Sequence, residues 1–303
     1  MKQALVSIAL CTYNGQKYLA EQIESLLNQS YRHFEVIIVD DCSTDGTFAV
    51  TTDFATRDAR IKCFANDVNL GFNKNFEKAL NLCTGNFIAI CDQDDIWEPN
   101  KIEVLLDAIG DNWMVYSNSI FMSADGKTFG RKLLENVNLP GKNYKALLLN
   151  NYISGHTAMF SREFLSYILP FPEQGFYDWW MGFIALYHER LAFADEVLTK
   201  YRQHELAATN DTRLSKRGIK RMYFNRILNQ LNVFLTYPNL KKADSDYINN
   251  LNNAFKLKLT KTLSAPLFKI IAADYHLLFP FQKVLKNLAK ITFAIKFSMG
   301  QKA

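Results

Sequence analysis

The segment F-E-V-I-I-V-D-D-C-S-T-D-G-T, residues 34–47, predicts a buried strand that ends in a polar loop. An apolar run of this length between turn residues is typical of a strand that is covered on both faces. Asp40 and Asp41 follow the run directly. Ser43, Thr44 and Asp45 can each serve as the N-cap of the helix that we expect after this loop. The segment therefore predicts a strand–loop–helix unit with polar side chains at the carboxyl end of its strand.

The same alternation recurs on both sides of this segment. Further apolar runs that predict strands are residues 5–11, 61–65, 87–91 and 114–118. Stretches with helical spacing are residues 18–29, 72–83 and a segment that begins near Pro99. Strands that alternate with helices predict right-handed βαβ units and a mostly parallel central sheet flanked by helices. The expected fold class is α/β, with a Rossmann-like arrangement.

Polar side chains cluster where four of these strands end. The clusters are residues 12–14, 40–43, 66–69 and 92–95. In open α/β sheets, ligands bind outside the carboxyl ends of the strands, where neighbouring loops meet. The sequence therefore predicts one binding site at this edge of the sheet.

Composition excludes several classes of protein. With 49% hydrophobic and 21% charged residues, the chain is not disordered or collagen-like. The five cysteines form no C-x-x-C pair, which favours buried thiols in a reducing compartment over a zinc site or a disulfide scaffold. The apolar run near the N-terminus predicts a strand and not a signal peptide. The most apolar stretch, residues 263–281, is interrupted by Lys269 and Asp274, so we expect no membrane span.

Charge divides the chain near residue 210. From Asp211 onward there are 17 Lys and Arg against 4 Asp and Glu, whereas the preceding part has 18 against 26. We therefore expect two domains, an α/β catalytic domain at 1–210 and a helical, basic extension at 211–303.

Three segments of the extension mix basic and apolar residues, namely 216–226, 255–261 and 284–297. That pattern is typical of interfacial helices on an anionic membrane surface. The alternative is a helical subdomain that packs on the catalytic domain. The extension contains no known nucleic-acid-binding module, so we expect no nucleic-acid partner.

The loop Asp92-Gln93-Asp94-Asp95 predicts a cation site. Three carboxylates at the end of one strand repel each other unless a cation lies between them. Oxygen ligands suit Mg²⁺ or Mn²⁺, which also bridge diphosphates. The alternative is an acidic cluster that stabilises the N-terminus of the following helix.

Six motifs in a fixed order resemble glycosyltransferase family 2, and its bacterial rhamnosyltransferase-like branch most closely. They are C-T-Y-N-G (11–15), V-D-D-C-S-T-D-G-T (39–47), N-L-G (69–71), D-Q-D-D-I-W (92–97), Y-D-W-W (177–180) and Y-R-Q-H (201–204). The resemblance covers about residues 4–210. It implies the GT-A fold, a nucleotide-diphosphate sugar donor, Mn²⁺ or Mg²⁺ as cofactor, and inversion at the anomeric carbon by direct displacement.

The resemblance also implies a role for each matching residue. The residues expected to bind the nucleotide sugar are Thr12, Tyr13, Asn14, Asp40, Asp41, Ser43, Asn69, Gly71, Lys74, Asp92, Gln93 and Arg202. The expected metal ligands are Asp94 and His204. Asp178 is the expected catalytic base, because an acceptor hydroxyl must lose its proton as it attacks. A capping role at the helix beginning at Trp179 would explain Asp178 equally well.

Four further residues are expected on the acceptor or sugar side: Gly155, His156, Trp179 and Trp180. Glycine permits a sugar to approach the backbone closely, and indole rings stack on sugar faces. The alternatives are a strand cap for His156 and core positions for the two tryptophans.

The sequence thus predicts an inverting, metal-dependent glycosyltransferase of cell-surface polysaccharide synthesis, such as lipopolysaccharide or capsule. It would transfer rhamnose or another hexose from a dTDP- or UDP-sugar to a saccharide or lipid-linked saccharide. We expect it in the cytoplasm, bound peripherally to the inner face of the membrane. One alternative is a nucleotidyltransferase, although residues 11–15 lack the usual Gly-rich phosphate loop. Another is a non-catalytic nucleotide-sugar-binding protein, which would not need Asp92, Asp94 and Asp178 together.

Overall fold

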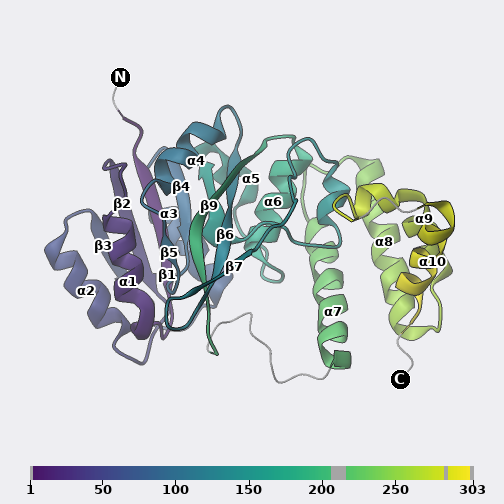
Figure 1. The fold of residues 1–303 in the computed structure, drawn as a ribbon, viewed down its shortest axis with the longest axis horizontal. Coiled ribbons are helices and arrows are strands. Elements are labelled where there is room, and N and C mark those ends of the chain that lie inside the picture. Colours follow the sequence, from purple (N-terminus) through teal and green to yellow (C-terminus); the bar gives the residue numbers. More distant parts are fainter. Residues whose placement is uncertain (1–2, 206–215, 283–285, 301–303) are drawn as a thin grey trace. The chain divides into compact units, whose positions relative to one another are not determined.

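The computed structural model describes residues 3–205, 216–282 and 286–300. These form two compact units (Figure 1). Unit 1 comprises residues 1–140, 153–173 and 188–210, and unit 2 comprises 141–152, 174–187 and 211–303. The expected boundary between residues 210 and 211 lies outside the described residues and stays a prediction. Two earlier segments, 141–152 and 174–187, cluster with the C-terminal helices instead, because their side chains pack there.

Unit 1 contains one sheet of nine strands in the order β3-β2-β1-β4-β8-β6-β9-β5, with β7 paired to β6. The strands are β1 (Val6–Thr12), β2 (Phe34–Asp40), β3 (Ile61–Ala65), β4 (Phe87–Cys91), β5 (Ile96–Trp97), β6 (Met114–Ser123), β7 (Thr128–Lys132), β8 (Ala158–Ser161) and β9 (Leu191–Gln203). The first four strands are parallel to one another, and β8 runs antiparallel to both β4 and β6. The predicted α/β architecture is confirmed.

Helices α1 (Gln16–Leu27), α2 (Thr47–Arg57), α3 (Phe72–Leu82), α4 (Lys101–Ile109) and the short α5 (Leu165–Ile168) belong to unit 1. The expected cap of α2 within residues 43–45 is wrong, because Gly46 occupies the N-cap position. Ser43 donates instead to the Asp40 carboxylate, while Asp45 Oδ1 accepts the backbone N–H of Thr47 at 3.0 Å. The helix that the sequence analysis expected to begin near Pro99 is α4, and it begins two residues later, at Lys101.

The core of unit 1 forms where the apolar strands meet the apolar faces of the helices. Ile8 and Val36 from the sheet belong to one buried cluster with Leu19 and Ile23 of α1. Full burial of each such side chain contributes about 1.5–3 kcal/mol. This packing holds β1, β2 and β4 side by side and fixes where their carboxyl ends lie.

Unit 2 is helical within the described residues. It contains the 3-10 helix η1 (Tyr144–Leu147) and helices α6 (Tyr177–Tyr187), α7 (Lys216–Phe234), α8 (Lys242–Thr260), α9 (Ala265–Leu278) and α10 (Asn287–Ser298). Phe183 of α6 stacks on Phe234 of α7 with ring centroids 4.0 Å apart. The predicted helical character of the extension is confirmed for the described part. Among the described helices, none combines the length and apolarity needed to cross a membrane.

Glu35 anchors the opposite, amino-terminal end of β2. Burial alone would raise the pKa of its carboxyl, but hydrogen bonds from Lys62, Ser7 and Thr84 outweigh burial and lower that pKa to about 2. The Lys62 ammonium lies 2.9 Å from Glu35 Oε2. The ionised carboxylate therefore stabilises the folded state.

We expect Glu35→Gln to lower the free energy of unfolding by about 2 kcal/mol at pH 7. A folded-state pKa below the unfolded value contributes stability above pH ~4.5 that is lost as pH falls towards ~2. The difference between the variant and the parent protein should therefore shrink between about pH 5 and pH 2. Urea unfolding at several pH values measures it. Glu24→Gln, at an exposed position of α1, is the matched control, and an equal effect there would contradict the assignment.

Candidate active site

Strand register brings the four polar clusters to one edge of the sheet. Thr12, the last residue of β1, is paired with Asp40 at the end of β2. Leu10 of β1 is paired with Cys91 at the end of β4, and Asp40 is paired with Ala65 of β3. The loops that follow these strands therefore lie side by side, as the sequence predicts.

Asp40 links the first two loops from within the protein. Its Oδ1 accepts the Thr12 hydroxyl at 2.7 Å and the Ser43 hydroxyl at 2.6 Å. The Ser43 oxygen in turn accepts the backbone N–H of Asn14 at 2.8 Å. Asn14 Oδ1 accepts the backbone N–H of Thr44 at 2.8 Å. The hydrogen bonds among these five residues hold the two loops together.

Asp41 holds the third loop. Its carboxylate accepts the backbone N–H groups of Leu70 at 2.7 Å and Gly71 at 2.9 Å, and Asn66 Nδ2 at 2.7 Å. Asn69 donates to the Asp41 carbonyl at 3.1 Å. Gly71 has a φ of +77°, which glycine adopts without strain. The sequence did not reveal this positioning role, and the expected contact of Asp41 with the nucleotide sugar stays a prediction.

Gln93 joins the first loop to the acidic loop, which we define as residues 92–95. Gln93 Oε1 accepts the backbone N–H of Tyr13 at 2.8 Å, and Gln93 Nε2 donates to the Tyr13 carbonyl at 3.0 Å. A side chain at Gly15 would place its Cβ 2.1 Å from Gln93 Oε1. The glycine in C-T-Y-N-G therefore makes room for this link, and the Tyr13 ring remains exposed.

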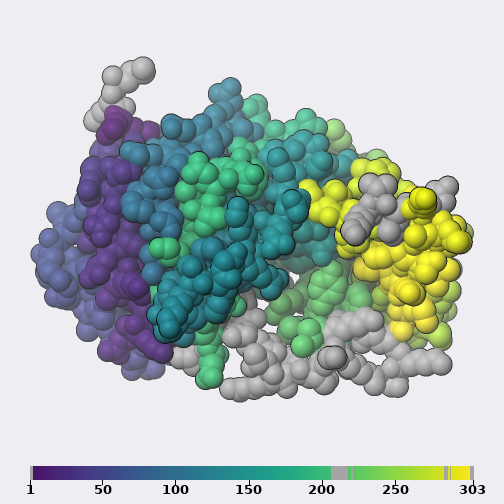
Figure 2. Space-filling view, viewed as in Figure 1, coloured from purple at the N-terminus to yellow at the C-terminus, as the bar shows by residue number. Residues whose placement is uncertain are grey.

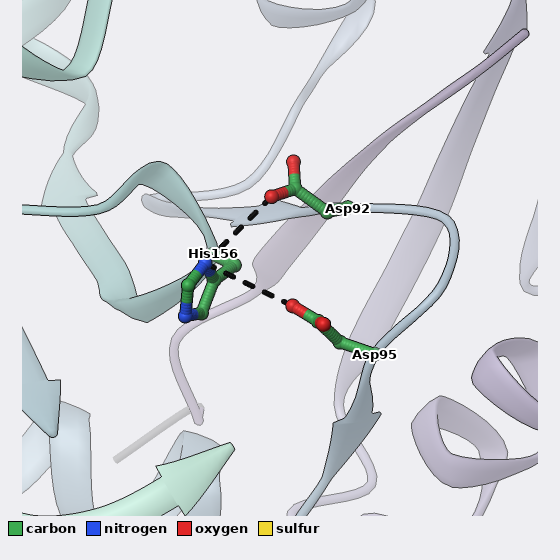
Figure 3. Close-up of side chains that lie close together, drawn as sticks. All are labelled: Asp92, Asp95 and His156. Carbon is green, nitrogen blue, oxygen red and sulfur yellow. Dashed lines mark ion pairs between the residues drawn. The ribbon is translucent and has the colours of Figure 1, made fainter. Parts of the chain in front are cut away.

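Three side chains of unit 1 converge at the acidic loop (Figure 3). His156 Nδ1 lies 3.7 Å from Asp92 Oδ2 and 3.8 Å from Asp95 Oδ2. One ligand atom from each residue lies within 4.8 Å of the others. Asp95 is fully buried, and its Oδ2 accepts no hydrogen bond from any residue that the structure describes. A pair of carboxylates and an imidazole at this spacing fits a divalent cation.

His156 reaches the acidic loop from the 3-10 helix η2 (Gly155–Thr157). Its ring stacks on Tyr201 with centroids 4.6 Å apart, and its Nε2 lies 3.1 Å from the Ser119 hydroxyl. Lys101 Nζ donates to the His156 carbonyl at 2.5 Å and to Thr199 Oγ1 at 2.8 Å. The sequence analysis expected His156 on the acceptor or sugar side, whereas in the structure its Nδ1 faces Asp92 and Asp95.

Lys101 was missed by the sequence analysis. It is fully buried, and its ammonium lies 3.7 Å from the centre of the Trp97 ring. Lys101 stands four residues before Leu105, on the buried face of α4. That spacing is the signal that could have identified it, because a lysine on an apolar helix face needs a specific partner.

Burial and the closeness of several carboxylates shift the pKa values of residues at the acidic loop. Burial and the Asp92 charge raise the pKa of Asp94, while His204 opposes the rise. Burial raises the pKa of Asp95 to about 7, against the opposing effect of His156, with Asp94 and Asp92 adding to the rise. Burial alone would lower the pKa of His156, but the charges of Asp95 and Asp92 raise it. A bound cation would relieve this repulsion between carboxylates.

The predicted metal ligands Asp94 and His204 also meet. His204 Nε2 lies 2.8 Å from Asp94 Oδ2. Each set of candidate ligands thus combines carboxylates of the acidic loop with a histidine from elsewhere in the chain: Asp94 with His204, and Asp92 and Asp95 with His156.

Arg202 supports the acidic loop from inside unit 1. Its guanidinium lies 2.5 Å from Glu21 Oε2, and its Nε donates to the Asp94 carbonyl at 2.8 Å. Its backbone N–H donates to Asp95 Oδ1 at 2.9 Å. Arg202 is 2% exposed, so we assign it a positioning role. The diphosphate contact implied by the resemblance is not tested. Glu21 was missed because its exposed position on α1 gave no sign of a distant partner.

The remaining candidates lie away from the acidic loop or in unit 2. Lys74 forms an ion pair with Glu77 at 3.2 Å on α3. Helix α6 begins at Tyr177, two residues earlier than expected, and places Asp178 in its first turn. Asp178 Oδ1 accepts Asn151 Nδ2 at 3.1 Å and the backbone N–H of Trp179 at 2.7 Å. The role of Asp178 as the base remains a prediction.

Trp179 and Trp180 are buried in unit 2. Trp179 Nε1 donates to the Leu147 carbonyl at 2.6 Å, and the Trp180 ring packs edge-on against Tyr237. Both tryptophans therefore occupy core positions, which was the alternative that the sequence analysis left open. Their stacking on a sugar stays a prediction.

Comparisons with known proteins identify the family. The family model described as Glycosyl transferase family 2 matches residues 7–169, more than half of the chain. An uncharacterized glycosyltransferase of Haemophilus influenzae is 37% identical over 108 residues, which are 36% of this chain and 33% of that protein. The putative teichuronic acid biosynthesis glycosyltransferase TuaG of Bacillus subtilis is 33% identical over 161 residues, 52% of this chain and 63% of TuaG. The match thus spans less than two thirds of either relative.

A third relative is matched over more of its length. The Escherichia coli protein WfgD, named a UDP-Glc:alpha-D-GlcNAc-diphosphoundecaprenol beta-1,3-glucosyltransferase, is 30% identical over 192 residues, 61% of this chain and 71% of WfgD.

Solved structures share the fold. Residues 1–349 of S. aureus TarS, crystallised with UDP-GlcNAc, superpose with a TM-score of 0.59 at 18% identity, covering 97% of this chain and 82% of that chain. The mannosyltransferase PcManGT from Pyrobaculum calidifontis, with GDP-Man and Mn²⁺, gives a TM-score of 0.52 at 17% identity, covering 96% and 85%. This likeness confirms the predicted GT-A fold.

Proposed function

This chain belongs to glycosyltransferase family 2, and from that premise we propose that it transfers a hexose from a UDP- or dTDP-sugar, with inversion, to a saccharide or lipid-linked saccharide. The name of WfgD specifies a UDP-sugar donor and a diphosphoundecaprenol-linked acceptor, and that of TuaG specifies teichuronic acid synthesis. These names support a role in cell-surface polysaccharide synthesis, which we propose takes place at the cytoplasmic face of the membrane. Rhamnose as the transferred sugar rests on the motif resemblance.

The observation that carries the proposal is the convergence of the acidic loop with the loops at Thr12–Asn14 and Asp41 on one edge of the sheet. A nucleotide and its diphosphate both need polar partners, and this edge offers backbone, amide and carboxylate groups together. Tyr13 and Asn69 are within the same set of loops. We propose that these residues bind the donor.

The acidic loop fits a divalent cation, Mn²⁺ or Mg²⁺. Asp92, Asp95 and His156 would hold it, with Asp94 and His204 as the neighbouring pair that the motif resemblance favours. A cation bound there would neutralise the negative charge that develops on the departing diphosphate. Lys101 and Arg202 hold the backbone around these ligands, so they preserve the spacing that the cation requires.

Asp178 is our proposed base. An acceptor hydroxyl that attacks the anomeric carbon transfers its proton to a carboxylate as the new bond forms. Asn151 and the Trp179 N–H orient Oδ1 of this carboxylate. The first turn of α6 also stabilises a negative charge, because helix N-termini carry a partial positive charge.

A thermal-shift screen tests the proposal. We expect a UDP- or dTDP-sugar with Mn²⁺ to stabilise the folded protein by about 2.7 kcal/mol at a concentration of about 100 times its Kd. EDTA should remove most of that shift. A preference for a nucleoside triphosphate over every nucleotide-diphosphate sugar would favour a nucleotidyltransferase. Binding of a donor that is never transferred or hydrolysed would favour a non-catalytic binding protein.

A further inference from the structure

Helix α10 presents an apolar patch to solvent. Three of its side chains, those of Leu288, Ile291 and Ile295, are exposed at successive steps of three and four residues, which places them on one face of the helix. We define the C-terminal patch as these three residues together with Met299, the C-cap of α10, and Leu263, which lies between α8 and α9: Leu263, Leu288, Ile291, Ile295 and Met299. Their exposed fractions lie between 42% and 78%. Leu263 and Met299 are joined by a backbone bridge, so Leu263 is continuous with the helix.

The opposite face of α10 is already packed within unit 2. Phe297 contacts Phe255 and Phe279, with ring centroids 6.0 Å and 5.3 Å apart, and Ala294 is fully buried. Lys258 Nζ donates to the Phe297 carbonyl near the end of the helix. Figure 1 draws α10 beside α9, and Figure 2 shows atoms of these helices, in yellow, at the surface. The C-terminal patch is therefore a second apolar face and not the core face of the helix.

The part of the chain that contains the C-terminal patch is strongly basic. From residue 247 to the end, the sequence contains nine lysines and a single acidic residue, Asp274. That carboxylate is paired with Lys145 at 2.9 Å. Three exposed lysines border the patch along the chain: Lys261, Lys286 and Lys296. An apolar surface with a basic border matches an anionic partner.

The other basic segments of the extension present less apolar surface. In 216–226, Phe224 is buried in the core, although Ile219 is 46% exposed. In 255–261, Phe255 and Lys258 are buried. Among the described side chains of the three segments that the sequence offered for membrane binding, the continuous exposed stripe lies in 284–297, which includes most of α10.

We propose that the C-terminal patch docks on an anionic lipid bilayer, with the apolar side chains entering the interface and the lysines contacting lipid headgroups. An interfacial helix combines an apolar face with basic residues in this way. Charge complementarity favours lipid over a second copy of this chain, because a two-fold contact would bring the lysines of both copies together. The inference does not rest on the proposed enzymatic activity.

Vesicle co-sedimentation of the full chain tests the proposal. We expect binding to vesicles of phosphatidylcholine mixed with phosphatidylglycerol, much weaker binding to phosphatidylcholine alone, and weakening with added salt. The double variant Leu288→Ser/Ile295→Ser should lower the partition coefficient about tenfold or more. Lys286→Glu/Lys296→Glu should abolish the preference for the anionic lipid.

Two matched controls replace exposed apolar residues elsewhere, Ile219→Ser on α7 and Phe129→Ser on β7. Both should bind vesicles as the parent protein does, and all variants should keep the parent Tm and donor-induced thermal shift. Equal loss of binding in the Ile219 control would assign the membrane contact to α7 instead. Full binding by the double variant would overturn the proposal. The proposal would also be overturned if the parent protein bound neither kind of vesicle, or if it formed a dimer through the C-terminal patch.

Discussion

Asp178→Asn is expected to slow sugar transfer by about 10²- to 10⁴-fold, because a positioned general base contributes that much to proton transfer. Asparagine has nearly the same shape, and its carbonyl oxygen can still accept the hydrogen bonds from Asn151 and the Trp179 N–H. The fold and the affinity for the donor should therefore survive. The loss should appear in kcat, since the amide cannot take up the proton.

Steady-state transfer assays with a UDP-sugar measure this effect, and calorimetry of donor binding separates it from a binding defect. Asp246→Asn is the matched control, because it removes a carboxylate from the exposed side of α8 in the same unit. Turnover of Asp178→Asn near that of the control would place the base elsewhere. Recovery of part of the rate in Asp178→Glu would support a role for the carboxylate itself.

Asp94→Ala is expected to weaken the metal-dependent binding of the donor by about 100-fold or more. Removing a residue that only supports a metal ligand typically costs 10- to 100-fold, so removing a ligand should cost at least as much. Titration calorimetry with and without Mn²⁺ measures the effect. Asp125→Ala, in the exposed turn between β6 and β7, is the control for the loss of one carboxylate from unit 1.

His156→Phe distinguishes the two candidate ligand sets. Phenylalanine keeps a ring that can stack on Tyr201 but removes the nitrogen that faces Asp92 and Asp95. If binding fails in Asp94→Ala alone, Asp94 and His204 hold the cation. If it fails in His156→Phe alone, the cation lies between Asp92, Asp95 and His156. Unchanged metal dependence in both variants would remove the acidic loop from the site.

The sequence was most informative where structure follows from short-range patterns. Continuous apolar runs at 5–11, 34–39 and 87–91 indicated buried parallel strands, and the polar residues after each run had to meet at one edge of the sheet. The structure places those strands at Val6–Thr12, Phe34–Asp40 and Phe87–Cys91. A shift of one residue in the pairing would exchange the side chains between the two covered faces of a strand, so each face would lose its fit to the elements that pack on it.

Side-chain partners far apart in the sequence were harder to predict. Arg202 lies against Glu21, and His156 faces Asp92 and Asp95, although neither pairing follows from local spacing. Lys101 resembled an ordinary first residue of a helix, and only the folded chain reveals its bond to the His156 carbonyl. Such contacts depend on which way each side chain points after the elements have packed.

The sequence by itself determined the alternating α/β pattern, the polar loops at the strand ends and the aspartates of the acidic loop. Strand and helix periodicity are local properties of the sequence. Because parallel strands are held in register, the loops that follow them meet at one edge of the sheet. The tertiary structure alone decided that His156 and Arg202 face that loop, that segments 141–152 and 174–187 cluster with the C-terminal helices, and which face of α10 stays exposed. These features depend on packing between distant segments, because burial is set by the partner that covers a side chain and not by its neighbours in the chain.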